Sequence, residues 1–388
     1  MSEIKFLAYY LPQYHPIPEN DKWWGKGFTE WTNVTKAKPL FENHYQPRFP
    51  ADLGYYDLRV PEVREQQAQI AKEYGVDGFC YYHYWFGNGK VLLERPLQEV
   101  IKFQSPDFPF CICWANETWK GVWFGGKNKE TLIEQVYPGK EDYINHFNYL
   151  LEAFKDKRYI KIEGKCLFCV YIPAEIPDLP VFVETFRQCA RDAGIGELYL
   201  LATRCPDDWD VKGNGFDGVI GSQFTSLRYV TARKLQKISI LKRVVNKIKR
   251  TFISEEQINL NFEERTKPLI VDYKEACEYL LPKESYTYDY HPCVVNDWDN
   301  TARAFNKSVV LHGSTPELWE SHLEEACKYV SHNNPKRQIV FIKSWNEWAE
   351  GNYLEPDSKW GFAYLQVIKK IKEKYQSINS NNSNASKH

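Results

Sequence analysis

The chain has 388 residues, of which 43% are hydrophobic, so it is long enough for one large barrel or for two or three smaller domains. Its formal net charge of -1 argues against general nucleic-acid binding. Aromatic residues make up 16% of the chain. Such side chains build walls that suit sugar rings as well as hydrophobic cores, so composition leaves both uses open.

Strand and helix patterns alternate along the chain. The predicted strands are short apolar runs at residues 4–10, 76–82, 110–114, 166–172, 198–203, 218–221, 294–296 and 340–344. Helical periodicity marks residues 61–74, 93–103, 144–154, 181–193, 316–330 and 361–375. Strands separated by helices predict a parallel sheet, and eight of them favour a closed (β/α)₈ barrel over an open sheet.

Three segments fall outside this alternation. Residues 11–58 form a long first βα loop, and a loop of this length in a compact domain is usually functional. Residues 222–291 form an insertion between the sixth and seventh strands, and residues 376–388 have the composition of a disordered tail. We therefore predict a single catalytic domain over residues 1–375.

The insertion contains a basic segment at residues 228–250, which holds many Lys and Arg and no acidic residue. Ile238, Leu241, Val245 and Ile248 fall on one face of a helix there. A basic amphipathic helix of this kind can lie on an anionic membrane surface, which the absence of acids favours. The alternative is a solvated helix that packs its apolar stripe on the barrel.

The ten cysteines do not indicate a disulfide framework. Half of them lie in apolar runs that we interpret as inner strands, where a free thiol behaves as a small hydrophobe; they are Cys80, Cys111, Cys113, Cys166 and Cys169. Cys166 and Cys169 have C-x-x-C spacing but lack the second pair of ligands that structural zinc requires. The sequence has no leader pattern and no run near the ~20 apolar residues of a membrane span, so we expect a reduced, cytoplasmic protein. We also expect that it needs no metal and no organic cofactor.

Polar and aromatic residues follow most of the predicted strands. Each alone has a structural explanation, such as loop capping or a hydrogen-bonded histidine. In a closed parallel barrel, however, all would project into one mouth. The candidate sugar-binding residues are Tyr10, His83, Trp85, Trp114, Asn116, Glu117, Trp119, Asp297, Trp345 and Asn346.

The candidate catalytic residues are Glu347 and Glu350, just after the last strand. In a continuing strand, positions three apart face opposite ways, so both can serve one site only if the chain turns near Trp348. Gly351, free to take a positive φ, makes that turn plausible. Two carboxylates among indoles suit glycosidic chemistry, because burial keeps one carboxyl protonated while the other acts as base or nucleophile.

Several ordered motifs resemble those of glycoside hydrolase family 99, the endo-α-mannosidases. The similarity is closer to the family 99-like proteins called WbsX, often described as glycosyltransferases of surface-polysaccharide (O-antigen) gene clusters. It covers nearly the whole chain and rests on residues 9–13 (YYLPQ), 27–32 (GFTEWT), 44–47 (HYQP), 81–86 (YYHYWF), 114–119 (WANETW), 296–303 (NDWDNTAR) and 345–351 (WNEWAEG).

The resemblance implies a retaining reaction in which the sugar's own 2-hydroxyl is the nucleophile. Glu347 would deprotonate that hydroxyl to give a 1,2-anhydro sugar, and Glu350 would protonate the leaving group and later activate water. Ala349 stands where the mannosidase motif has His, so mannose specificity is not implied.

We therefore expect an enzyme that cleaves or transfers a glycosidic bond of a surface-polysaccharide-type or lipid-linked saccharide. The alternative is a metal- and nucleotide-sugar-dependent glycosyltransferase, because Asp297/Asp299 and Asp208/Asp210 have the D-x-D spacing that can hold a divalent cation. The chain contains no G-x-G-x-x-G, which weakens that reading. A non-catalytic carbohydrate-binding barrel is disfavoured by the intact acid pair.

Overall fold

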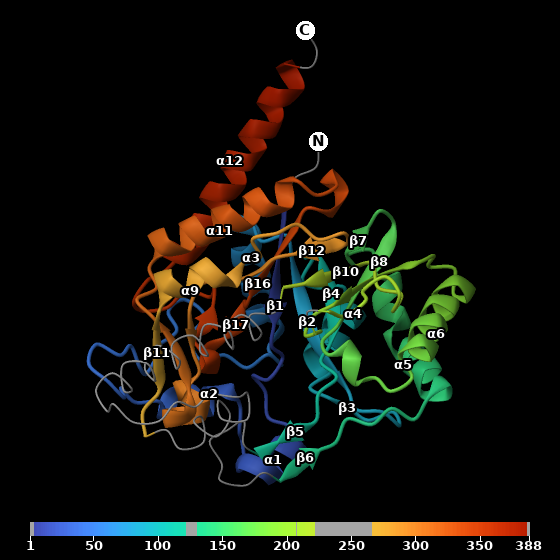
Figure 1. The fold of residues 1–388 in the computed structure, drawn as a ribbon. Helices are drawn as coiled ribbons and strands as arrows, with labels where there is room; N and C mark the ends of the chain where they lie inside the picture. The colour runs from blue at the N-terminus through green and yellow to red at the C-terminus, as the bar shows by residue number, and fades with distance from the viewer. Residues whose placement is uncertain (1–3, 122–129, 207, 222–265, 386–388) are drawn as a thin grey trace, which may run out of the picture.

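Nine parallel strands surround the core of the computed structural model, which describes residues 4–121, 130–206, 208–221 and 266–385 (Figure 1). In sheet order they are β12 (Asp289–His291), β10 (Gly218–Ile220), β9 (Leu198–Ala202), β8 (Lys165–Val170), β4 (Phe110–Trp114), β2 (Gly78–Trp85), β1 (Lys5–Tyr10), β16 (Ile339–Lys343) and β13 (Cys293–Val295). Most of these strands are buried along their whole length, as strands covered on both faces must be. The predicted barrel is confirmed.

The first and last strands of this order are consecutive in the chain. Only Pro292 separates β12 from β13, and a proline has no N–H to give to a sheet. On one side of this break Gly221 N donates to the carbonyl of His291, at 2.8 Å. On the other side Phe341 N donates to the carbonyl of Pro292, also at 2.8 Å. The predicted seventh strand is β13, whereas β12 lies within the predicted insertion, and the two short strands together nearly close the barrel.

Helices cover the outside of the barrel at the predicted positions. They are α3 (Pro61–Glu73), α4 (Arg95–Phe103), α5 (Lys140–Lys155), α6 (Leu179–Asp192), α11 (Pro316–Ser331) and α12 (Ala363–Ala385). Proline in the first turn of α3 and α11 fits a position whose N–H has no helical partner. In α12 the helix continues to Ala385, so the prediction of disorder from Gln376 is wrong. Helix propagation costs little once packing has formed the first turns, so a polar sequence can extend a packed helix.

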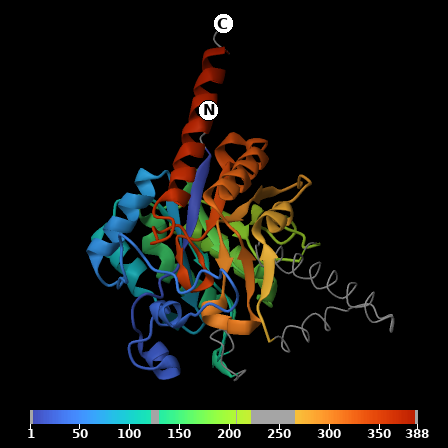
Figure 2. The ribbon, with the colours of Figure 1, turned by 90° about the vertical axis from the view of Figure 1, so that its left-hand side faces the viewer.

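The long first loop is folded. It contains α1 (Pro18–Trp24) and α2 (Glu30–Lys36), and α2 begins with a capping box between Thr29 and Thr32. Figure 1 shows α1 at the same end of the molecule as the hairpin of β5 (Trp119–Lys120) and β6 (Thr131–Ile133), away from both termini. Figure 2 shows α12 projecting from the opposite end. The mouth at the carboxyl ends of the strands is therefore built from loops near α1 and β5.

A second, small sheet that the sequence did not reveal combines one strand of the insertion with two strands that follow β13 in the chain. Its strands are β11 (Leu269–Asp272), β15 (Val309–His312) and β14 (Trp298–Asp299), with α9 (Tyr273–Leu280) packed on them. Of the predicted insertion, residues 222–265, with the basic segment 228–250, lie outside the described residues. The described ranges also contain short connecting elements: β3 (Val91–Leu92), β7 (Lys161–Ile162), α10 (Thr301–Ala304) and 3₁₀ turns at Pro173–Glu175, Phe305–Lys307, Pro335–Arg337 and Trp348–Glu350.

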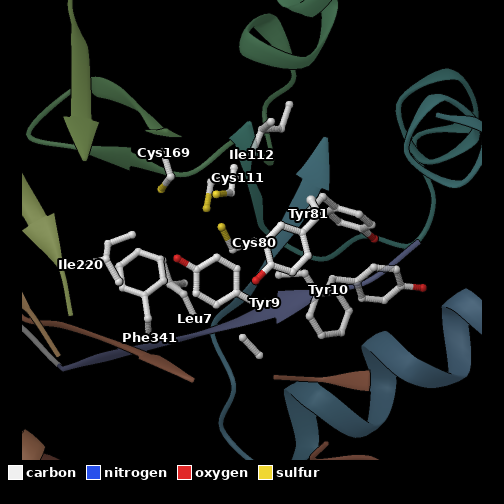
Figure 3. Close-up of a cluster of buried hydrophobic side chains, with 14 of the residues drawn as sticks. Leu7, Tyr9, Tyr10, Cys80, Tyr81, Cys111, Ile112, Cys169, Ile220 and Phe341 are labelled. Atoms are coloured by element: carbon white, nitrogen blue, oxygen red, sulfur yellow. The ribbon is translucent and has the colours of Figure 1, made fainter. Parts of the chain in front are cut away.

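All ten cysteines lie in the described ranges, and seven of them are buried. Figure 3 shows the thiols of Cys80, Cys111 and Cys169 close to one another between strands of the barrel, beside aromatic rings. No group of three or more His, Cys, Asp or Glu within the described ranges has the arrangement of a metal site. The buried cysteines pack as small core residues.

Candidate active site

The acid pair lies on a tight turn that follows β16. Asn346–Glu347 (β17) pairs antiparallel with Asn352–Tyr353 (β18), and the residues between them form the 3₁₀ turn Trp348–Glu350. Gly351 ends this turn with a φ of 64°. A Cβ at that position would lie 2.9 Å from Asp299 N, so the turn requires glycine for space as well as for conformation. The predicted turn at Trp348 is confirmed, and it brings the two carboxyls to one side.

Buried hydrogen bonds fix this turn to the first loop. The Asn346 amide accepts from Leu11 N at 2.8 Å and donates to Leu11 O at 3.0 Å. The Trp348 indole donates to Glu355 at 2.6 Å. Glu355 also accepts from Tyr56 and Gln67, at 2.9 and 2.6 Å. Burial raises the pKa of Glu355 to about 7 although these donors favour its ionised form.

Two cations approach the acid pair. Lys343, the last residue of β16, lies with its Nζ 3.0 Å from Glu347 Oε1 and 3.6 Å from Glu350 Oε2. Arg303, from α10, places Nη1 2.7 Å from Glu350 Oε1. The same guanidinium contacts Glu30 Oε2 through Nη2 at 3.1 Å. All five side chains are buried or nearly so, which makes their charges interact strongly.

The two carboxyls titrate at opposite ends of the pH scale. Burial, and then the charge of Glu350, raises the pKa of Glu347 to about 8, which Lys343 only partly offsets. Burial also raises the pKa of Glu350, but Lys343 and Arg303 outweigh it and lower that pKa to about 2. These directions favour a proton on Glu347 over a proton on Glu350.

A cavity that opens to solvent lies over the pair. Aromatic rings and charged groups share its wall, which consists of Leu11, Gln13, Glu30, Tyr82, Tyr84, Ala115, Glu117, Trp119, Lys120, Tyr171, Arg303, Lys343, Glu347 and Glu350. Four of the predicted site residues are among them: Glu347, Glu350, Glu117 and Trp119. Glu117 is ion-paired with Arg204 at 3.0 Å, and the half-buried Trp119 packs edge-on against Tyr84.

Four predicted sugar-binding residues face the helices instead of the cavity. Tyr10 donates to Gln67 of α3 at 2.7 Å. His83 Nε2 lies 3.0 Å from His146 Nε2 of α5, and Trp85 donates to Asp142 of the same helix at 2.9 Å. Trp114 packs on Phe182 of α6. The structure places these four residues away from the cavity because alternate strand residues face opposite sides: on β2 it is Tyr82 and Tyr84 that line the cavity.

Three more predicted residues hold loops and the core in place and do not line the cavity. Asn116 accepts from Ile172 N and donates to Ile172 O, both at 2.8 Å, which joins the loops after β4 and β8. Asn346 makes the same kind of clamp on Leu11. Trp345 is fully buried and packs against Phe79. None of the three lines the cavity within the described part of the chain, because each is needed for a backbone or core contact.

Asp297 and Asp299 also lie outside the cavity. Arg48 holds Asp297 at 2.9 Å, and Asp299 accepts from His44 and Gln46, each at 2.8 Å. Of the second D-x-D sequence, Asp210 accepts from Gly213 N at 2.9 Å within a turn, and Asp208 is exposed. The carboxylates of the first pair are engaged by protein donors, so they act as supports for the loop that carries Gly351.

Sequence reasoning missed the groups that set the charge of the site, namely Glu30, Arg303 and Lys343. The sequence held one clue to Lys343: this lysine ends the apolar run IVFIK, four residues before Glu347. Glu30 and Arg303 occur in the motifs GFTEWT and NDWDNTAR, but nothing in those motifs says that they meet. The structure joins them across 273 residues of chain.

No helix in the described ranges is long and apolar enough to cross a membrane. The basic segment 228–250 lies beyond those ranges, so its predicted contact with a membrane stays a prediction.

Known proteins share both the sequence and the fold. The family model named Glycosyltransferase WbsX matches residues 6–368. Two relatives, named uncharacterized protein WxcX in two strains of Xanthomonas campestris pv. campestris, are 36% identical over 366 residues, which is 94% of this chain and 49% of each relative. The chain thus spans about half the length of these relatives.

Solved structures show the same architecture at low identity. One is a glycoside hydrolase-like protein, with a TM-score of 0.55 and 14% identity, covering 95% of this chain and 94% of that one. Two structures of the GH99 endo-alpha-mannosidase from Bacteroides thetaiotaomicron have TM-scores of 0.53 and 0.51 at 12% identity, covering 98% of this chain and 100% of theirs. At these identities the likeness concerns the fold alone.

Proposed function

Because the chain belongs to the WbsX glycosyltransferase family, and its fold is that of glycoside hydrolase-like proteins, we propose that it cleaves or transfers a glycosidic bond with Glu347 and Glu350 as the reacting groups. The substrate in this proposal is a surface-polysaccharide-type or lipid-linked saccharide, and the product keeps its anomeric configuration. The enzyme works without a metal or organic cofactor. A cytoplasmic location, with membrane contact through residues 228–250, belongs to the same proposal.

The contacts of the acid pair carry this proposal. Lys343 lies 3.0 Å from Glu347 and Arg303 lies 2.7 Å from Glu350, and among the described residues no donor reaches Glu347 Oε2, so that oxygen can carry a proton. One protonated and one ionised carboxyl beside an aromatic-walled cavity is the arrangement that glycosidic bond cleavage needs. The protonated group gives its proton to the leaving oxygen, and the ionised group accepts a proton.

We assign the starting roles from this charge distribution. The resemblance implies Glu347 as base and Glu350 as acid, but that requires the reverse distribution of the proton in the free enzyme. The cation contacts favour Glu350 as base and Glu347 as acid. The chemistry is otherwise the one that the resemblance implies.

In the first half of the reaction, Glu350 takes the proton of the sugar 2-hydroxyl. The resulting O2 attacks C1, the bond from C1 to the leaving oxygen breaks, and Glu347 gives its proton to that oxygen. In the second half, Glu347 removes a proton from water or from an acceptor hydroxyl, which attacks C1 and opens the C1–O2 bond. Glu350 then returns its proton to O2. Two inversions at C1 give net retention.

The metal-dependent transferase receives less support. It needs free carboxylates at a D-x-D sequence, whereas Asp297 and Asp299 are bound by Arg48, His44 and Gln46 outside the cavity. Transfer to a second sugar in place of water, by contrast, uses the same acid pair and belongs to our proposal.

The test is to incubate the protein with saccharide fragments of the surface polysaccharide of its own organism, follow anomeric products by NMR, and repeat the reaction with EDTA. We expect a retained anomer, EDTA-insensitive turnover, and loss of turnover in Glu350→Gln with little change in melting temperature. A folded Glu350→Gln protein with full turnover rejects the assignment. Turnover that needs a divalent cation and a nucleotide sugar supports the transferase instead.

A further inference from the structure

We propose that Arg303, oriented by Glu30, is a positioning residue that keeps the negative charge on Glu350 and so leaves the shared proton on Glu347. This inference rests on the proposed function for its catalytic meaning. It concerns two residues that reach the acid pair from other loops: Glu30 begins α2 in the first loop, and Arg303 lies in α10 after β14.

The contacts form a buried chain from Glu30 to Glu350. Arg303 Nε and Nη2 both lie 3.1 Å from Glu30 Oε2, while Nη1 lies 2.7 Å from Glu350 Oε1. The side chain of Glu30 is fully buried and that of Arg303 is 12% exposed. A guanidinium presents its donors in a rigid fork, so binding Glu30 with one side aims the other side at Glu350.

The local charges balance only if the site holds one proton. Three carboxyls lie here (Glu30, Glu347 and Glu350) together with two cations (Arg303 and Lys343), which leaves one negative charge if every group is ionised. An uncompensated charge in a buried site is costly, so one carboxyl binds a proton.

Burial raises the pKa of Glu30 as well, and Arg303 partly offsets that rise. Between the two acids of the pair, Arg303 favours the charge on Glu350. Lys343 reaches both members of the pair, whereas the hydrogen bonds of Arg303 go to Glu350 and Glu30. Asn352 adds a weak donor to Glu350 at 3.5 Å. Together, the contacts of Lys343, Arg303 and Asn352 favour an ionised Glu350 and a protonated Glu347.

The other titratable groups around the pair do not change this balance. Burial raises the pKa values of Tyr82, Tyr84 and Tyr171 well above 10.0, and that of Cys293 to about 12, so these groups are neutral at working pH. Glu117 is paired with Arg204.

Without Arg303, Glu350 keeps only the more distant cation. Lys343 lies 3.0 Å from Glu347 but 3.6 Å from Glu350, so the negative charge on Glu350 is then less stable. Replacing Arg303 by Gln therefore raises the pKa of Glu350 and narrows its difference from that of Glu347. Replacing it by Lys keeps a cation beside Glu350 and leaves the proton where it is. Replacing Glu30 by Gln removes a negative charge near the pair and lowers the pKa of Glu347.

The test is a pH titration of protein labelled with ¹³C at the glutamate side-chain carboxyls, with the two signals assigned from Glu347→Gln and Glu350→Gln. In wild type we expect the Glu347 signal to titrate near pH 8 and the Glu350 signal to stay ionised down to about pH 2. In Arg303→Gln the Glu350 midpoint rises by about 1–3 pH units, while in Arg303→Lys it does not rise. An unchanged Glu350 midpoint in Arg303→Gln, or an equal rise in both variants, overturns the proposal.

Glu30→Gln provides a second measurement. We expect the titration midpoint of Glu347 to be lower in this variant than in wild type, and an unchanged midpoint would contradict the proposed role of Glu30. Because the titration needs no substrate, its outcome is independent of the proposed function. If the midpoints behave as stated but no saccharide is cleaved or transferred, the charge arrangement stands and the proposed function fails.

Discussion

Replacing Lys343 by Met tests the protonation state of the acid pair through stability alone. The substitution keeps a long unbranched side chain and removes an ammonium that is 3% exposed and contacts Glu347, Glu350 and the Tyr82 hydroxyl, the last at 3.2 Å. Removing one partner of a buried ion pair typically costs about 3–5 kcal/mol, because the other charge is left uncompensated. Here the expected cost depends on whether Glu347 is charged.

If Glu347 is protonated at pH 6.5, no charge is stranded beside it and Glu350 keeps Arg303. The cost is then that of the lost hydrogen bonds, about 1–2 kcal/mol in the free energy of unfolding. An acid whose pKa is raised by folding loses stability as pH rises from its unfolded to its folded pKa. In wild type the free energy of unfolding stops falling near pH 8, the pKa of folded Glu347. In Lys343→Met that pKa is higher, so the free energy of unfolding continues to fall above pH 8. Each further pH unit adds about 1.4 kcal/mol to the cost.

The assay is urea unfolding of wild type and Lys343→Met at pH 6.5 and pH 9, with both measurements repeated in a Glu347→Gln background. We expect the cost of Lys343→Met to increase between the two pH values, and the increase to vanish when residue 347 is Gln. A cost of about 3–5 kcal/mol already at pH 6.5, without further increase, would mean that both carboxylates are ionised and would refute the reasoning.

Further predictions follow from other parts of the site. Activity as kcat/KM should decline above pH 8, as Glu347 loses its proton, and should hold toward acidic pH down to the unfolding of the protein; a decline centred near pH 5 would contradict the low pKa of Glu350. Trp119→Ala should raise KM with little change in melting temperature, whereas the matched change Trp114→Ala, at a buried position outside the cavity, should cost about 3–5 kcal/mol of stability. The pKa of Glu355 rises on folding to about 7, so the free energy of unfolding should fall by about 3 kcal/mol as the pH increases from 4.5 to 7. Urea unfolding at those two pH values should show this fall in wild type, and the part due to residue 355 should be missing in Glu355→Gln.

The sequence was sufficient for the barrel because its strands are buried on both faces and therefore read as unbroken apolar runs. The same property hid the orientation of the site. On β2 every residue from Gly78 to Trp85 is buried, so hydrophobicity does not distinguish the side that faces the cavity from the side that faces α5. His83 and Trp85 were chosen for their chemistry, while the neighbouring Tyr82 and Tyr84 line the cavity.

Local geometry was predictable where adjacent residues determine it. The turn from Glu347 to Gly351 follows from a glycine with positive φ directly after the acid pair. The ion pairs that set the protonation of these acids were not predictable, because they join Glu30, Arg303 and Glu350 from three separate loops. Asp297 and Asp299 illustrate the converse: their spacing suggested a cation site, and their partners Arg48 and His44, about 250 residues earlier, show a structural role.

The leaving-group dependence of the two acid variants tests the central claim most directly. Once a substrate sugar is known, kcat/KM is measured for wild type, Glu347→Gln and Glu350→Gln on its glycosides with a sugar leaving group and with a dinitrophenolate leaving group, which needs no proton. We predict that Glu347→Gln loses about 10²–10⁴ in rate on the first substrate and recovers on the second, while Glu350→Gln stays inactive on both. Recovery of Glu350→Gln instead would reverse the two roles, and equal losses on both substrates in both variants would contradict proton donation by either carboxyl.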